Sequence, residues 1–566
     1  MSSLSLKPYQ EDRQERGIYD KRNPLNDLTG KEWLFSTKTV IPKKYPLLWP
    51  SNIKSRNFSL VPSELSKEII ETFSKPHETV LDPFAGIGST LIGSYFANDY
   101  INPPRRKCIG IENNRPLINN FYELAQKLNI PADGMLEGDP LSLLSEIKED
   151  SVDLICTDIP IWDISNLNEK ESVTIPPKEF NQSLEETLRS WFSSVCEILF
   201  IASKKLKISK YLVIGVPPEL LRRNKGQEEP WSINFALSSI IAHNIQKIGL
   251  ALKSERLWFI PSKKEDGIGF RPLKRRFLIF RREKQNLKRI DNQFRSFDLQ
   301  LPIGGTIIIH KSYPPSYSHK LRSQHGGMKP PELAQILIER YSKKHGELIL
   351  DPFAGVGGTL LGASLTKRRA VGIDINEQWK NIYLEVTHDA KLPAQEFMIG
   401  DSRQLIGSTF SDESIDLILT DVPYWAMDKL KKTRGRYSKA GEQSKDKLPT
   451  PLKKFNQTPL LTIDEWLILL KDVFSQCHPK LVNERYLVVF IGNMYRTITE
   501  IDNGKTVKVG KYLMLSSMLA ELLLDIGYKF EQEIIWYAPD KALHVFGYPF
   551  SYIPSIVHQS ILVLKK

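Results

Sequence analysis

The residues best placed to do chemistry end one predicted strand, in the order Asp421, Val422, Pro423, Tyr424, Trp425. An aspartate oxygen and the backbone carbonyl of the next residue can each accept one hydrogen of an amino group, which orients the nitrogen for in-line attack. Tyr424 can stack on a base that has left a duplex, with Trp425 as a further wall. An acidic strand end followed by a packed aromatic residue, with no catalytic role, would have the same sequence. Other motifs in the chain must distinguish the two interpretations.

Two glycine turns supply such surroundings, DPFAGIG at residues 82–88 and DPFAGVG at residues 351–357. Each follows a predicted strand and opens a predicted helix. Glycines at such a turn let the backbone approach a ligand closely, as nucleotide-like cofactors require at the carboxyl edge of a doubly wound sheet.

Acidic residues recur after both turns. Glu112 and Asp374 end the next predicted strand, where an acid can accept bonds from ribose hydroxyls. Asp139 and Asp401 stand where a third strand should end. An ordinary helix N-cap would explain any one of these acids, but the ordered set occurs twice.

The sequence contains an internal repeat, since similar blocks recur in the same order 262 to 269 positions apart. CIGIENN matches AVGIDIN, SVDLICTDIPIW matches SIDLILTDVPYW, and SERLWFIP matches QEIIWYAP. Short β-branched runs alternate with segments of helical period, which predicts an α/β fold: two tandem Rossmann-like domains, each a mostly parallel sheet with helices on both faces. We place the domains at residues 1–290 and 291–566, with a polar linker near residues 284–298.

The sequence resembles the class I methyltransferases, specifically the DNA amino-methyltransferases that modify adenine N6 or cytosine N4. The resemblance covers nearly the whole chain, once per half, and rests on the glycine turns, the acids and the tetrapeptide at 421–424. It implies S-adenosylmethionine as cofactor and methyl transfer to an exocyclic amino group of a flipped base. The trailing Trp425 and leading Thr420 favour cytosine N4 slightly, whereas Asp421 suits adenine enzymes.

The resemblance assigns residues in both halves. The catalytic residues it implies are Asp421, Val422, Pro423 and Tyr424. The cofactor residues of the second half are Asp351, Phe353, Gly355, Gly357, Asp374, Asp401 and Pro331. A second cofactor site would use Asp82, Phe84, Gly86, Gly88, Glu112 and Asp139.

The first half departs from the family pattern at its tetrapeptide. Asp158 and Pro160 remain, but Ile161 replaces the stacking aromatic residue and Trp162 comes one position late. We therefore expect a first domain that has lost catalysis and binds DNA, cofactor or its twin, the two domains forming an internal pseudo-dimer. Further oligomerisation cannot be read from the sequence.

Basic residues follow the second tetrapeptide. Residues 429–454 hold ten Lys and Arg against Glu442 and Asp446, inside a loop we place at residues 426–460. Next to a base pocket this charge suits phosphates, and the net charge of +12 suits a polyanion. The residues expected to bind nucleic acid are Trp425, Lys431, Lys432, Arg434 and Arg436.

Double-stranded DNA is the expected partner; similar tetrapeptides also serve RNA methyltransferases, and a non-catalytic scaffold is the third alternative. Restriction-modification, defence and regulation all fit the resemblance.

Four scattered cysteines form no CxxC pair, so neither a disulfide framework nor a metal site is expected. Apolar runs are too short to cross a bilayer and the N-terminus is too charged for a signal peptide, so we expect a cytoplasmic protein. The stretch from TDIPIW to DPFAGVGGT also fits a permuted domain, in which the catalytic tetrapeptide precedes the cofactor turn. We favour contiguous domains, in which the cofactor turn comes first and Asp421 faces the Gly355 turn.

Overall fold

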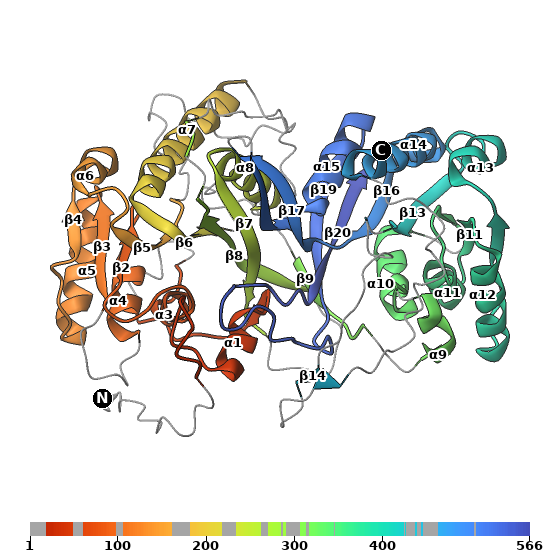
Figure 1. The fold of residues 1–566 in the computed structure, drawn as a ribbon. Helices are drawn as coiled ribbons and strands as arrows, with labels where there is room; N and C mark the ends of the chain where they lie inside the picture. Colours follow the sequence, from red (N-terminus) through yellow and green to blue (C-terminus); the bar gives the residue numbers. More distant parts are fainter. Residues whose placement is uncertain are drawn as a thin grey trace, which may run out of the picture. The chain divides into compact units, whose positions relative to one another are not determined.

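The computed structural model divides the chain into two compact units (Figure 1). It describes residues 19–48, 60–97, 106–160, 182–217, 234–261, 270–284, 287–289, 306–312, 316–317, 319–325, 327–343, 346–423, 425, 436–437, 443–444, 462–502 and 505–566. Unit 1 comprises Met1–Ile307, Met494–Met514 and Ala542–His558, and unit 2 comprises Ile308–Asn493, Leu515–Lys541 and Gln559–Lys566.

Unit 1 contains a mixed sheet with the strand order β4-β3-β2-β5-β6-β8-β7. These strands are β2 (Thr79–Asp82), β3 (Lys107–Glu112), β4 (Met135–Glu137), β5 (Val152–Asp158), β6 (Leu206–Val216), β7 (Leu250–Phe259) and β8 (Phe270–Arg282). Neighbours from β4 to β6 run parallel, whereas β8 is antiparallel to both β6 and β7. A short strand, β1 (Val40–Pro42), runs parallel to β7.

Several hydrophobic cores of the described part of unit 1 are formed by its helices. These helices are α1 (Gly30–Ser36), α3 (Ser63–Phe73), α4 (Ser89–Phe96), α5 (Arg115–Leu128), α6 (Pro140–Glu146), α7 (Gln182–Lys205) and α8 (Asn234–Lys247). Along β5, Leu154 and Cys156 join the core that contains α3, while Ile155 joins the core of α7 and α8. Because successive strand residues point to opposite faces, this alternation places helices on both faces of the sheet.

Unit 2 repeats the same order as β12-β11-β10-β13-β16-β20-β19. These strands are β10 (Leu348–Asp351), β11 (Arg369–Asp374), β12 (Glu396–Ile399), β13 (Ile415–Asp421), β16 (Leu481–Ile491), β19 (Lys529–Tyr537) and β20 (His558–Lys565). Strands from β12 to β16 are parallel and β20 is antiparallel to β16. The mostly parallel α/β fold predicted for each half is thus confirmed.

Helices of unit 2 differ in how they begin, and only some of them have a side-chain cap. They are α9 (His319–Arg322), η2 (Ser323–His325), α10 (Pro331–Tyr341), α11 (Gly358–Leu365), α12 (Glu377–Asp389), α13 (Ser402–Thr409), α14 (Ile463–Lys480) and α15 (Leu515–Ile526). Thr462 and Glu465 form a capping box at the start of α14, which satisfies backbone N–H groups that the first helical turn leaves free. Two short strands, β14 (Arg436–Tyr437) and β15 (Gln443–Ser444), pair with each other, and β9 (Thr306–Ile309) spans the passage from unit 1 to unit 2 along the chain.

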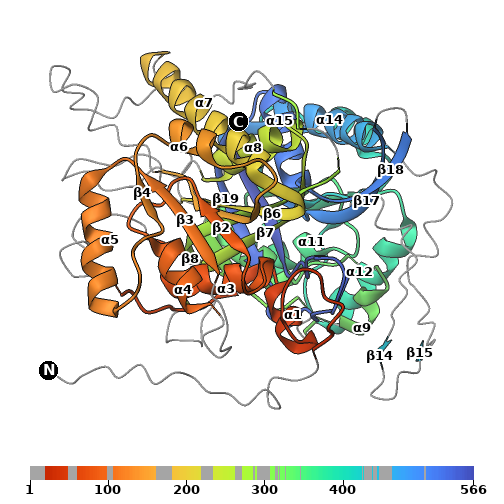
Figure 2. The ribbon, with the colours of Figure 1, turned by 60° about the vertical axis from the view of Figure 1, so that its left-hand side comes forward.

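Two segments from the second half of the sequence fold into unit 1. One is the ribbon of β17 (Met494–Asp502) and β18 (Lys505–Leu513), visible in Figure 2. Its Tyr512 hydroxyl donates to Glu255 Oε1 at 2.7 Å. The other is residues 542–558, whose Phe546 carbonyl accepts from Trp33 Nε1 at 3.1 Å. A boundary at residues 290 and 291 stays a prediction, but unit 1 is not one contiguous stretch of sequence.

Candidate active site

The glycine turn of unit 2 is tied to the strand that carries the tetrapeptide. Asp351 ends β10 and is only 3% exposed, and its Oδ1 accepts from Thr420 Oγ1 at 2.6 Å and from Phe353 N at 3.1 Å. Burial raises the pKa of Asp351 to about 6. Since Thr420 immediately precedes Asp421, this buried bond brings the turn and the tetrapeptide to one edge of the sheet.

Backbone geometry makes the turn a close-approach surface. Gly355 has φ 50° and Gly357 has φ 72°, both in the left-handed region that favours glycine. A Cβ on Gly357 would lie 2.2 Å from the Tyr383 ring, so this glycine is required by packing against α12. A Cβ on Gly355 would lie 3.0 Å from His325 Nε2, so the turn leaves room for bare backbone only.

The acid at the end of β11 holds the turn from the other side. Asp374 accepts from Gly355 N through Oδ2 at 2.9 Å and from Asn376 N through Oδ1 at 2.9 Å. Burial raises the pKa of Asp374. The lone pairs that these bonds leave unused can accept ribose hydroxyls. The acid therefore shapes the turn and can also meet a ligand, a double role that the sequence did not indicate.

The remaining predicted cofactor residues lie around the turn in different ways. Asp401 is the N-cap of α13, accepting from Arg403 N at 2.9 Å, and the hydrogen bond from the Arg403 guanidinium lowers its pKa. Pro331 is buried at the first position of α10, and Phe353 is half-buried against Phe474. For Asp401 the ordinary capping role is thus present, and a bond to adenine stays a prediction.

The tetrapeptide begins at the carboxyl end of β13, between β10 and β16. Val422 is buried, and the Pro423 carbonyl accepts from Trp466 Nε1 on α14 at 2.8 Å. Trp425 is half-buried. Tyr424, Lys431, Lys432 and Arg434 lie outside the described residues; Arg436 falls in β14, with its side chain not described. Trp466, which sequence reasoning missed, therefore holds the turn that follows Asp421.

Lys329 is the second residue that the sequence analysis missed. Its Nζ contacts Asp421 Oδ2 at 2.5 Å, and its side chain is only 8% exposed. The ammonium group also lies 5.7 Å from the Phe490 ring centre and 5.9 Å from that of Trp536, within cation–π range. A lysine directly before Pro330, at the start of a helix beside the glycine turn, was the available signal.

Two basic residues, Arg322 and His325, precede Lys329. Arg322 is 1% exposed and donates to the Lys329 carbonyl at 2.7 Å. His325 packs edge-on against Trp379, with ring centres 4.9 Å apart. Burial, followed by the positive charges of Lys329 and Arg322, lowers the pKa of His325 to about 4. The imidazole next to Gly355 is consequently neutral at pH 7.

Unit 1 builds its glycine turn in the same manner. Asp82 Oδ1 accepts from Thr157 Oγ1 at 2.5 Å, and Gly86 N donates to Glu112 Oε2 at 2.8 Å. A Cβ on Gly88 would lie 2.2 Å from Phe121. Of two further predicted residues, Phe84 is half-buried within the turn, and Asp139 is exposed and forms the N-cap of α6. The second cofactor site of the sequence analysis has an intact backbone cradle, although its use stays a prediction.

The motif aspartate of unit 1 has a different partner. Asp158 Oδ2 contacts Arg275 Nη2 on β8 at 2.8 Å, and the Arg275 side chain is fully buried. Pro160 is exposed, while Trp162 lies outside the described residues. A guanidinium on this aspartate was not predicted, because it comes from a strand more than a hundred residues later in the chain.

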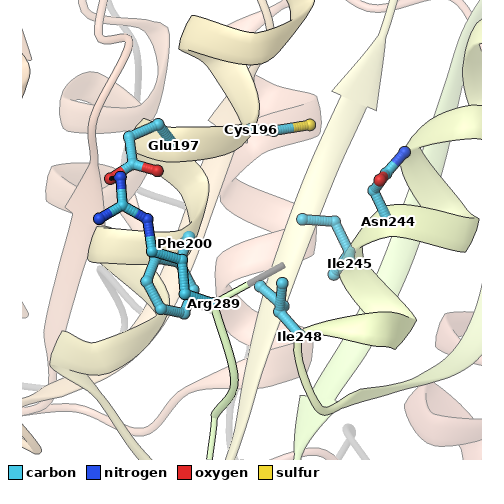
Figure 3. Close-up of a pocket in the computed structure, with 7 residues that line it drawn as sticks. All are labelled: Cys196, Glu197, Phe200, Asn244, Ile245, Ile248 and Arg289. Carbon is cyan, nitrogen blue, oxygen red and sulfur yellow. Dashed lines mark ion pairs between the residues drawn. The ribbon is translucent and has the colours of Figure 1, made fainter. Parts of the chain in front are cut away.

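A small cavity lies between α7 and α8 of unit 1, and no residue of the unit 1 glycine turn lines it (Figure 3). Its lining includes Cys196, Phe200 and Asn244, and an ion pair of 3.1 Å between Arg289 and Glu197 lies at its rim. The cavity holds about 10 Å³, close to the minimum for one water, so it is too small for a cofactor. Among the described residues, no cluster of three or more His, Cys, Asp or Glu side chains could hold a metal ion, and no helix is long and apolar enough to cross a membrane.

Several known proteins are similar to this chain in sequence. A tRNA (guanine(10)-N2)-dimethyltransferase of Methanothermobacter thermautotrophicus is 35% identical over 106 residues, which are 19% of this chain and 30% of that protein. The corresponding enzyme of Methanocaldococcus jannaschii is 29% identical over 119 residues, 19% of this chain and 31% of that protein. Type II methyltransferase M.HpaI of Haemophilus parainfluenzae is 24% identical over 246 residues, 42% of this chain and 69% of that protein. The chain thus spans under a third of the length of the two tRNA enzymes.

Among solved structures, TrmN of Thermus thermophilus matches at 14% identity and a TM-score of 0.26, over 55% of this chain and 60% of that one. A 16S rRNA methyltransferase of the same organism, solved with AdoMet and guanosine, matches at 12% identity and a TM-score of 0.24, over 89% and 91%.

A family model described as DNA methylase (N6_N4_Mtase) matches residues 5–123 and 152–385, which is more than half of the chain. These matches include both glycine turns and the tetrapeptide of unit 1. The bare backbone of each turn and the acid behind it also fit S-adenosylmethionine, the cofactor of these enzymes. The chain belongs to the DNA methylase family of S-adenosylmethionine-dependent methyltransferases.

Proposed function

We propose that unit 2 transfers a methyl group from S-adenosylmethionine to an exocyclic amino group of a base in DNA, and that unit 1 does not catalyse this reaction. The observation that carries the proposal is the buried bond between Thr420 and Asp351. Through this bond, the acid that would orient the amino group and the turn that would receive the methyl donor share one edge of the sheet.

The cofactor supplies a methyl group on a positively charged sulfur. The turn at Gly355 would offer bare backbone to it, and Asp374 would offer lone pairs to its ribose. Asp421 accepts one amino hydrogen of the base and the Val422 carbonyl the other, which directs the nitrogen lone pair toward the donor. Trp466 keeps the following carbonyl in place, so the backbone of the tetrapeptide is fixed before the base arrives.

DNA is favoured by the family and by the similarity to M.HpaI over 42% of the chain. RNA is the second candidate, because two relatives are tRNA (guanine(10)-N2)-dimethyltransferases. Within DNA, the residues around Asp421 favour cytosine N4 only slightly. Thr420 is explained by its bond to Asp351, so that preference rests on Trp425.

Unit 1 retains the glycine turn and its acid but presents its motif aspartate to a buried arginine. We infer that it binds cofactor or nucleic acid without methylating. If neither unit bound cofactor, the chain would instead be a nucleic-acid-binding scaffold.

Transfer of labelled methyl groups tests these proposals. The full chain is incubated with labelled S-adenosylmethionine and either unmethylated duplex DNA or total RNA, and the products are identified by nucleoside mass spectrometry. Asp421→Ala should abolish labelling of DNA, while the matched variant Asp158→Ala should leave it near the wild-type level. Labelling of RNA alone would replace the DNA proposal by the RNA one, and loss of labelling in Asp158→Ala would refute the assignment of catalysis to unit 2.

A further inference from the structure

The motif aspartates of the two units occupy equivalent strand ends but point at different cations. Asp158 in unit 1 contacts Arg275 on β8, whereas Asp421 in unit 2 contacts Lys329 just before α10. Both cations are buried, at 0% and 8% exposure of their side chains. The difference in direction therefore needs a local cause.

The strand next to each motif aspartate provides a local cause for this difference. Asp158 is paired in register with Gly215 on β6, and Asp421 with Phe490 on β16. A Cβ on Gly215 would lie 2.2 Å from Asp158 Oδ1, so this carboxylate occupies the space of the missing side chain. Although a third of the Asp158 side chain is exposed, its Oδ1 is buried and accepts no hydrogen bond within the described part of unit 1. In unit 2 the paired residue is Phe490, which carries a buried side chain, 2% exposed, where unit 1 has a glycine.

Each unit also has an uncharged residue at the position where the other unit carries its cation. By the repeat, Val61 stands in unit 1 where Lys329 stands in unit 2. By the register of the antiparallel ladders, Gln559 stands in unit 2 where Arg275 stands in unit 1. The aromatic residue beside Asp421 is also the one that supports Lys329, at 5.7 Å from its ring centre.

We propose that the residue beside the motif aspartate, Gly215 in unit 1 and Phe490 in unit 2, decides which unit can present that aspartate to a substrate amino group. This inference rests on the proposed function of unit 2. In unit 1 the glycine lets Asp158 lean over β6 to Arg275, whose guanidinium N–H takes the place of the substrate donor. In unit 2 Phe490 closes that direction, and Lys329 keeps Asp421 at the mouth of the cofactor turn.

The two cations differ in what they allow. Arg275 is a planar, fully buried guanidinium that no substrate can displace without leaving a charge unpaired inside the protein. Lys329 carries a compact charge on a flexible stem, so an incoming amino group can share Asp421 with it. Phe490 and Lys329 are thus positioning residues that act on the reaction through Asp421.

Transplanting the unit 1 arrangement into unit 2 tests the proposal. The double variant Phe490→Gly with Gln559→Arg should turn Asp421 toward β20 and lower kcat at least about 100-fold, the scale of losing one oriented polar group. Its Kd for S-adenosylmethionine should stay within about threefold of wild type, because the glycine turn is untouched. Gln559→Arg alone, with Phe490 still in place, should keep kcat within about threefold.

Two readouts separate this proposal from a folding defect and from failure of the proposed function. Hydrogen exchange of peptides from α11 and β13, measured with and without cofactor, reports that unit 2 of the double variant is folded and binds it, and the crystal structure reports the direction of Asp421. A double variant that keeps more than about a third of the wild-type kcat, or whose Asp421 still contacts Lys329, would overturn the proposal. If the wild-type protein methylates no nucleic acid, the proposed function fails, and the inference is then judged by the crystal structure alone.

Discussion

Replacing Asp351 by Asn should make unit 2 more stable at neutral pH. Asp351 has an ordinary pKa of 3.8 that burial raises to about 6. Because the folded protein holds this proton more tightly than the unfolded chain, the free energy of unfolding falls as pH rises from about 4 to about 6. A shift of about two units at about 1.4 kcal/mol each corresponds to a loss of roughly 3 kcal/mol at pH 7.

Asn should remove this loss without removing the bonds. Thr420 Oγ1 and Phe353 N both donate to Oδ1 of Asp351, and an amide oxygen can accept from both. The Thr359 hydroxyl also bonds Asp351, and it can instead accept from the amide nitrogen of Asn. Relative to wild type, Asp351→Asn should therefore gain stability progressively between about pH 4 and pH 7, by an amount of order 2–3 kcal/mol less any misfit of the amide nitrogen.

Hydrogen exchange measured across this pH range can follow each unit separately, through peptides from α11 and β13 for unit 2 and from α4 and β5 for unit 1. Asp82→Asn is the matched control, since burial also raises the pKa of Asp82 to about 6. It should change the pH dependence of unit 1 and leave that of unit 2 as in wild type. A difference between wild type and Asp351→Asn that is constant with pH, or one that favours wild type increasingly above pH 6, would refute the argument.

Three other substitutions test separate contacts. Trp466→Phe loses the 2.8 Å bond to the Pro423 carbonyl and should lower kcat about tenfold, equivalent to about 1.4 kcal/mol, at unchanged cofactor Kd. The control Trp191→Phe, at the position of unit 1 that corresponds to Trp466, should have no effect on kcat. Equal losses of kcat in the two variants would show that Trp466 does not position the tetrapeptide. Arg276→Met removes the 2.5 Å partner of buried Glu255 and should cost unit 1 about 3–5 kcal/mol, seen as a lower melting temperature, whereas exposed Arg22→Met should cost little. Gly357→Ala places a Cβ 2.2 Å from Tyr383 at a positive φ and should weaken cofactor binding at least about tenfold by calorimetry, and near-normal binding would show that the turn tolerates a side chain.

Sequence patterns predicted the parts of the fold that depend on local periodicity. The repeat placed β10 and β13 in one domain and β2 and β5 in the other, as the structure has them. They did not predict that residues 494–514 and 542–558 belong to unit 1. These segments lie where the repeat has no matching block, and their contacts, such as Tyr512 with Glu255, join residues 257 positions apart.

The acids singled out in the sequence have hydrogen-bond partners that residue types and spacing do not predict. Asp374 holds the backbone of Gly355, and Asp401 caps α13. Lys329 was missed because its partner Asp421 is 92 residues away, and Arg275 because its contact depends on the register of β8 against β6. Strand order follows from local hydrophobic patterns, whereas the direction of one carboxylate depends on whether a neighbouring strand carries a glycine or a phenylalanine.

The family match also explains why motif order left the domain arrangement open. One matched region, residues 152–385, starts at the strand of Asp158 and ends beyond the glycine turn of unit 2, so it contains acid and turn in permuted order. In space, however, Asp158 accompanies the turn at Gly86, because β5 pairs with β2, and Asp421 accompanies the turn at Gly355, because β13 pairs with β10. The adjacency of these two strands is what brings acid and turn together. The same two strands can be adjacent whichever of them comes first in the sequence, so both motif orders can build one site. Only the strand pairing assigns each aspartate to its glycine turn.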